Sequence, residues 1–230
     1  MKSDRAKLRI AGVLFLSAFL AYGIGTGMVT GIIEATNPTV ELALERAQFI
    51  TGAALMLVNS AIVTSIGLLL LPMLVRFNRA VAWSYLAARA IEAIALAVGV
   101  MSLLLLVTAE SPVTQTGIMK ASRGNFFAYQ AGMAVLGFVS LFFCALLYRC
   151  RIVPRFLAAW GFVGYAVFFV GAVLEIAGLP YGIMLSIPGG LFEIAFGVWL
   201  ITKGFDNTHA AAWPNTAFER EAPRAARPSI

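Results

Sequence analysis

Four ionisable residues lie inside long apolar stretches of the sequence, where a charge is expensive. They are Arg89, Glu92, Glu175 and Glu193. A charged side chain at the centre of a bilayer costs about 3 kcal/mol on insertion scales, so residues of this kind are functional candidates by default. Carboxylates beside a guanidinium can bind a small molecule, an ion or a proton, and they can equally hold helices together as a buried ion pair.

Other site chemistries are excluded by residue type. The only histidine is His209, beyond the apolar stretches, and these stretches contain no Lys or Asp. This excludes His-ligated haem or metal inside them, and also Ser-His and Ser-Lys dyads. No nucleotide-binding motif is present. We therefore expect no metal, no cofactor and no catalytic residues; an enzyme would need a site made of glutamates, Arg89 and hydroxyls.

The composition is that of a membrane protein. Of the 230 residues, 60% are hydrophobic and 12% are charged, whereas a soluble domain is about half apolar and about a quarter charged. The net charge of +6 does not indicate a nucleic-acid partner, because Lys and Arg stand at the ends of apolar segments. That position is typical of topology signals and lipid headgroup contacts.

Six apolar runs are long enough to cross a bilayer, for which a helix needs about 20 residues. They cover residues 10–33, 47–75, 81–107, 124–148, 156–179 and 182–201. These runs predict an all-α, polytopic membrane protein, a bundle of six transmembrane helices within residues 10–203. No connection is long enough for a soluble domain, so the activity must lie in the bilayer or at its faces.

The two ends of the chain differ from the spans. Residues 1–9 are basic, and with the apolar run that follows they also fit a signal peptide. Because residues 10–33 exceed a typical signal-peptide core, we interpret them as a retained span. Residues 204–230 are rich in Pro and poor in apolar periodicity, and we predict a disordered cytoplasmic tail.

The distribution of Lys and Arg predicts the orientation. Most of the 17 basic residues lie in segments 1–9, 76–79, 149–155 and 203–230, which fall on one side of a six-span bundle. Positive charge accumulates on the cytoplasmic side. We therefore predict that both termini are cytoplasmic.

Residue depths suggest a polar layer near the membrane centre. With a rise of about 1.5 Å per residue, Arg89 lies about 12 Å, Glu92 about 16 Å and Glu193 about 15 Å from the cytoplasmic ends of their spans. Arg89 and Glu92 share a helix face because they are spaced i, i+3. Asn59 falls near the same level. This layer is either a ligand, ion or proton site or a set of structural contacts between helices.

Three further polar residues are predicted near the outer face. Glu175 lies four residues before the end of the fifth span, and Arg46, at the outer start of the second span, is a candidate partner for it. Gln130 on the fourth span lies at a similar depth. Because these side chains are nearer water, we expect a secondary polar group there.

Two backbone features stand out. Gly23, Gly27 and Gly31 place small residues on one face of the first span, which is typical of close helix packing. Residues 186–190, Ser-Ile-Pro-Gly-Gly, interrupt the last span. They indicate either a broken helix that lines a binding site or, as we favour, a helix that starts near Pro188 and is capped by Ser186.

Several of these segments together resemble a family of bacterial membrane proteins, domain of unknown function 4386. The similar segments are Arg9–Leu14, Arg89–Ala93, Tyr148–Arg155, and Glu193 with Val198–Gly204. The resemblance covers about residues 9–205 and implies a multi-pass protein of the bacterial inner membrane. It implies no reaction, substrate or catalytic residue.

Three hypotheses on function follow for a protein whose surroundings are the lipid bilayer. The first is binding or transport of a small or lipid-like ligand through Asn59, Arg89, Glu92 and Glu193. The second is a regulatory or scaffold subunit that self-associates or binds another membrane protein through the glycine face or the tail. The third is a glutamate-based intramembrane enzyme.

Overall fold

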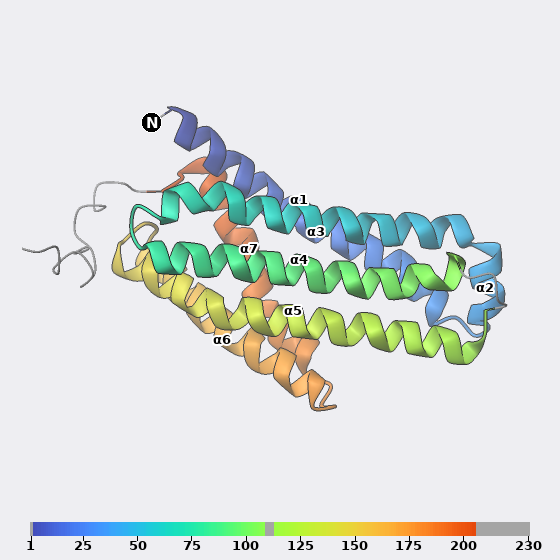
Figure 1. The fold of residues 1–230 in the computed structure, drawn as a ribbon. Coiled ribbons are helices and arrows are strands. Elements are labelled where there is room, and N and C mark those ends of the chain that lie inside the picture. Colours follow the sequence, from blue (N-terminus) through green and yellow to red (C-terminus); the bar gives the residue numbers. More distant parts are fainter. Residues whose placement is uncertain (1, 109–112, 206–230) are drawn as a thin grey trace, which may run out of the picture.

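The computed structural model describes residues 2–108 and 113–205, and within them it contains seven helices and no strand. The helices are α1 Lys2–Ile33, α2 Pro38–Leu44, α3 Arg46–Leu74, α4 Arg79–Thr108, α5 Gln115–Arg149, α6 Arg155–Ile176 and α7 Gly182–Thr202 (Figure 1). All except α2 are long and apolar enough to cross a membrane. The predicted all-α polytopic bundle is confirmed. The predicted disordered tail lies outside the described residues from position 206 onward.

Two differences from the expected spans have local causes. The short helix α2 begins with Pro38, whose fixed φ suits a first helical position, and it connects α1 to α3. α5 begins nine residues before the apolar run, because the Thr114 hydroxyl accepts a hydrogen bond from the Gly117 N–H and caps a polar first turn. Apolar length alone therefore underestimated the helical length.

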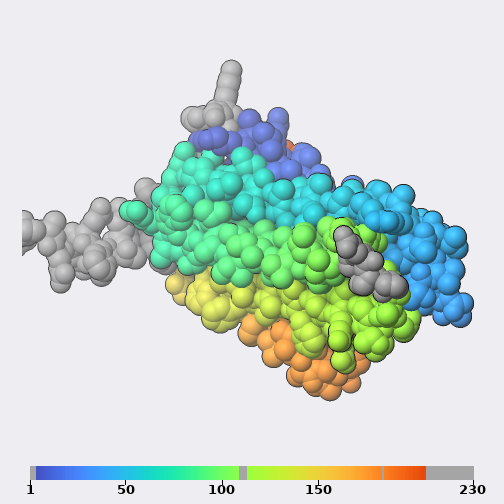
Figure 2. All heavy atoms as spheres, turned by 45° about the vertical axis from the view of Figure 1, so that its right-hand side comes forward, coloured from blue at the N-terminus to red at the C-terminus, as the bar shows by residue number. Residues whose placement is uncertain are grey.

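The six long helices form a closed ring. Each packs against its neighbour in the chain, in the order α1, α3, α4, α5, α6, α7, and α7 packs against α1 to close the ring. Figure 2 shows α3, α4 and α5 side by side on one face of the molecule, with α2 at the end. In this ring α4 lies opposite α7, so a contact between them must cross the interior.

The two ends of the described chain lie at the same end of the bundle (Figure 1). Arg76, in the connection between α3 and α4, forms an ion pair of 3.1 Å with Asp4, and the Arg9 side chain donates a hydrogen bond to the Ile201 carbonyl. The basic segments of the sequence are thus gathered at one end. We still predict, from charge alone, that this end is cytoplasmic.

Glycines allow close helix approach at positions other than those expected. A Cβ on Gly12 would lie 2.5 Å from the Gly197 carbonyl oxygen, and one on Gly25 would lie 2.6 Å from that of Gly52. Gly23, Gly27 and Gly31, by contrast, face open space, with no atom within 4 Å of an added Cβ. The close helix packing that their spacing favours is therefore not made within the described chain.

α7 continues through the Pro-Gly-Gly segment. It starts at Gly182 and contains Pro188 in its interior, so neither a broken helix nor a cap at Ser186 is present. The glycines have a packing role, because Gly189 lies against the Gly164 carbonyl of α6. The expected interruption is a site of close helix crossing.

The largest cluster of buried residues fills the half of the bundle nearer the termini. It includes the aromatic rings of Phe143, Phe192 and Phe196, which contact one another at centroid distances of 5.5 and 5.7 Å. Phe15 of α1 joins them edge-on against Phe196. This packed half supports the polar residues described next.

Candidate polar site inside the helix ring

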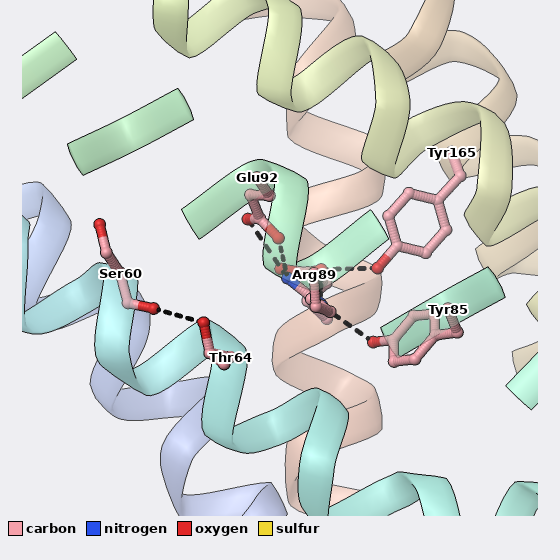
Figure 3. A network of polar contacts seen from close by, with 7 residues as sticks. Ser60, Thr64, Tyr85, Arg89, Glu92 and Tyr165 are labelled. Atoms are coloured by element: carbon pink, nitrogen blue, oxygen red, sulfur yellow. Dashed lines mark hydrogen bonds and ion pairs between the residues drawn. The ribbon is translucent and has the colours of Figure 1, made fainter. Parts of the chain in front are cut away.

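Arg89 lies at the centre of a network of polar contacts in the ring. Its Nη1 donates to both carboxylate oxygens of Glu92, at 2.9 and 3.3 Å, and its Nε donates to the Tyr85 hydroxyl at 3.1 Å. Figure 3 shows Arg89 between these two side chains. The three residues occupy one face of α4 because they are spaced four and three positions apart.

The network crosses the ring to the opposite helix. Nη2 of Arg89 forms an ion pair of 2.8 Å with Oε1 of Glu193 on α7. The Tyr165 hydroxyl, from α6, donates to the same oxygen at 2.6 Å. Among the described residues, Oε1 is the only Glu193 oxygen with a hydrogen-bond partner.

Burial divides the charged residues into two kinds. The side chains of Arg89 and Glu92 are 2% and 5% exposed, whereas that of Glu193 is 16% exposed. A buried ion pair needs its remaining polar atoms satisfied, and Arg89 meets this demand with a partner on each of its three nitrogens. Glu193 is therefore the charged member that a bound molecule can reach.

Sequence reasoning missed Tyr85 and Tyr165. Both are fully buried, and a tyrosine in an apolar run carries no charge that would single it out. The spacing of Tyr85, one helical turn before Arg89, was a usable signal. Tyr165 could not be found this way, because its contact depends on how α6 and α7 are rotated.

Asn59 on α3 is buried without a hydrogen bond to its side-chain oxygen from any described residue. The Thr64 hydroxyl on the same helix, by contrast, has a partner, because it donates to the Ser60 carbonyl (Figure 3). A buried amide oxygen left unpaired costs about 1–3 kcal/mol. A side chain in this state is suited to accept a hydrogen bond from a bound molecule.

A cavity of about 410 Å³ brings these residues together. Arg89, Glu92, Glu193 and Asn59 all line it, and every helix of the ring contributes to its wall. The rest of the wall is mostly apolar and includes the aromatic residues Phe15, Phe19, Tyr22, Tyr129, Tyr165 and Phe168. Concave, mainly apolar sites with a few convergent polar groups are typical of ligand-binding sites.

The cavity reaches the molecular surface between α1 and α7. The lining residues that are exposed all lie on these two helices: Phe19, Gly23, Ile187, Leu191 and Ile194. α1 and α7 meet closely at Gly12 and Gly197, toward the end with the termini. The opening therefore faces sideways, toward the lipid of a surrounding bilayer.

The three residues predicted near the outer face do not form one group. Arg46 donates to the Val107 carbonyl on α4, and Glu175 accepts a hydrogen bond of 2.7 Å from the Gly182 N–H. The expected Arg46–Glu175 pair is absent among the described residues, because α3 and α6 are not neighbours in the ring. Gln130 is buried on α5 and does not line the cavity.

The arrangement can bind and orient a molecule through hydrogen bonds and charge. Within the described part of the chain, no three His, Cys, Asp or Glu side chains are grouped to hold a metal ion. The acceptors with free capacity among the described residues are the buried Oδ1 of Asn59 and the partly exposed carboxylate of Glu193.

Comparison with known proteins gives one match. A family model described as domain of unknown function (DUF4386) matches residues 10–204. No curated protein and no solved structure matches the chain.

Proposed function

Since the chain belongs to this family of unknown function and has six helices that can cross a membrane, we propose from its geometry that it binds a small or lipid-like ligand in the cavity inside the helix ring. The observation that carries the proposal is that the unpaired Oδ1 of Asn59 and the partly exposed Glu193 belong to residues that line one cavity, which opens toward lipid. A fold that keeps an unpaired polar group and a partly exposed carboxylate there gives up stability, which is the trade-off expected of a working site.

Gly23 and Gly27 provide a matched test. Both are exposed glycines of α1 with open space around an added Cβ, but only Gly23 lines the cavity. Gly23→Phe should therefore obstruct the opening without disturbing the fold, and Gly27→Phe should leave it free.

The measurement is native mass spectrometry of the protein extracted from its own membranes. We expect a bound small molecule or lipid on the wild type and on Gly27→Phe, and none on Gly23→Phe. The same occupancy in all three proteins, or no bound molecule on any of them, would contradict the proposal. Transport would add a substrate flux that is lost in Glu193→Gln.

The open glycine face of α1 favours a second candidate function, a regulatory or scaffold subunit. Small residues let a second helix approach closely in lipid, and nothing in the described chain covers Gly27 or Gly31. The occupant would be one transmembrane helix of another membrane protein. A photo-crosslinker placed at Gly27 should capture one defined partner protein. The same crosslinker at lipid-facing Ile94 is the control and should not capture that partner. Capture of this chain alone would count against the scaffold function.

A further inference from the structure

The ionisable residues around the cavity leave an excess of negative charge. Glu92 and Glu193 face Arg89, and among the described residues Arg89 is the only basic one in the cavity wall. Two carboxylates and one guanidinium carry a formal charge of −1. A net charge in a low-dielectric interior is expensive, so a proton or a bound cation must balance it.

The free hydrogen-bonding capacity of the site is mainly that of an acceptor. Arg89 already donates from Nε, Nη1 and Nη2 to Tyr85, Glu92 and Glu193. Nη2 has one further N–H, but an anionic ligand bound to it would share a single guanidinium with the carboxylates of Glu92 and Glu193. Asn59 Oδ1 and the second oxygen of Glu193 have no partner among the described residues, so a donor or a positive centre suits them.

The aromatic wall is suited to a cation with apolar groups. Ring faces attract positive charge, and the guanidinium of Arg89 already lies 5.3 Å from the Phe15 centroid and 5.4 Å from that of Tyr85. Tyr22 and Tyr129 stack at 5.4 Å in another part of the wall. Such rings bind both the charge and the apolar body of one molecule.

We propose that the cavity binds a lipophilic organic cation, an amine or a quaternary onium ion with apolar or aromatic substituents. Its positive centre lies near Glu193 and Asn59, and it enters from lipid between α1 and α7. This inference rests on the proposed function and specifies its ligand class. The lateral opening suits such a molecule, because an apolar cation concentrates in the membrane.

The test compares two ions of the same shape and opposite charge. Tetraphenylphosphonium and tetraphenylborate each carry four phenyl groups around one centre. Equilibrium binding of each is measured to the wild-type protein in lipid nanodiscs, and binding to empty nanodiscs is subtracted. We expect saturable binding of the phosphonium ion and none of the borate ion.

Variants locate the binding. Gly23→Phe should abolish phosphonium binding, Gly27→Phe should leave it unchanged, and Glu193→Gln should weaken it by about tenfold or more. Because the comparison of the two ions uses the wild type alone, it remains decisive even if Glu193→Gln fails to fold.

The remaining outcomes separate this inference from the proposed function. Borate binding that equals phosphonium binding and is lost in Gly23→Phe would overturn the cation assignment while the cavity remains a ligand site. The cation assignment would also be overturned if neither ion bound to a protein that carries a co-purified ligand. If neither ion binds and no ligand co-purifies, both proposals fall.

Discussion

Arg89 on α4 and Glu193 on α7 are 104 positions apart in the chain and form an ion pair of 2.8 Å across the interior of the helix ring. α4 and α7 are opposite members of the ring. Most contacts between helices of this bundle are made by helices that are neighbours in the ring. The Arg89–Glu193 pair instead joins two helices that are not neighbours. It is both a structural crosslink and part of the cavity wall.

Arg89→Ala should be strongly destabilising. It leaves Glu92 and Glu193 without their cationic partner, and breaking a buried ion pair in this way costs about 3–5 kcal/mol. The measurement is unfolding in detergent of the wild type, Arg89→Ala, Glu193→Gln and the double variant. We expect a coupling of about 1 kcal/mol or more between the two sites. Additive effects would show that the pair is not an energetic unit.

Asn59→Leu should have unchanged or raised stability. The substitution removes a buried amide whose oxygen has no partner and replaces it with an apolar side chain of similar size. Thermal unfolding in the absence of added ligand checks this, with binding measured in parallel. A clear loss of stability would mean that Asn59 supports the fold, and the site would then lose its unpaired acceptor.

Gly12→Ala should destabilise the contact between α1 and α7 by about 1–3 kcal/mol. The new Cβ would lie 2.5 Å from the Gly197 carbonyl oxygen, and forced overpacking of this kind costs that amount. Gly27→Ala on the same helix is the matched control, because open space surrounds it, and we expect a change within about 0.5 kcal/mol. Equal effects of both variants would mean that the close crossing is not where the structure has it.

Glu175→Ala should cost about 1 kcal/mol by removing a cap from the start of α7. The carboxylate accepts the Gly182 N–H, one of the first N–H groups of that helix. Glu175→Gln keeps an acceptor and should be milder. Arg46→Ala should add to Glu175→Ala without coupling, since Arg46 bonds to Val107. Measurable coupling between the two substitutions would instead support the Arg46–Glu175 ion pair expected from the sequence.

The predicted orientation can be tested by cysteine labelling in intact cells. In a background with Cys144→Ala and Cys150→Ala, Val40→Cys on α2 and Lys203→Cys mark opposite ends of the bundle. A membrane-impermeant maleimide should label position 40 directly and position 203 only after permeabilisation. The reverse pattern would show that the termini lie outside.

The sequence by itself determined what depends on one segment at a time. Apolar length identified the six membrane-spanning helices, and the period of 3.6 residues placed Arg89 and Glu92 on one face. Counting along each span put Arg89 and Glu193 at a common depth, because the rise per residue is constant.

Only the tertiary structure decided what depends on the order and rotation of helices in the ring. Gly12 and Gly25 make close contacts while Gly23 and Gly27 face open space, although all four are glycines of the same helix. The order and rotation of the helices also explain why the Tyr165 hydroxyl donates to Glu193, and why Glu175 bonds to Gly182 and not to Arg46. Every helix in lipid has the same apolar surroundings on all sides, so hydrophobic pattern alone cannot tell which face meets which neighbour.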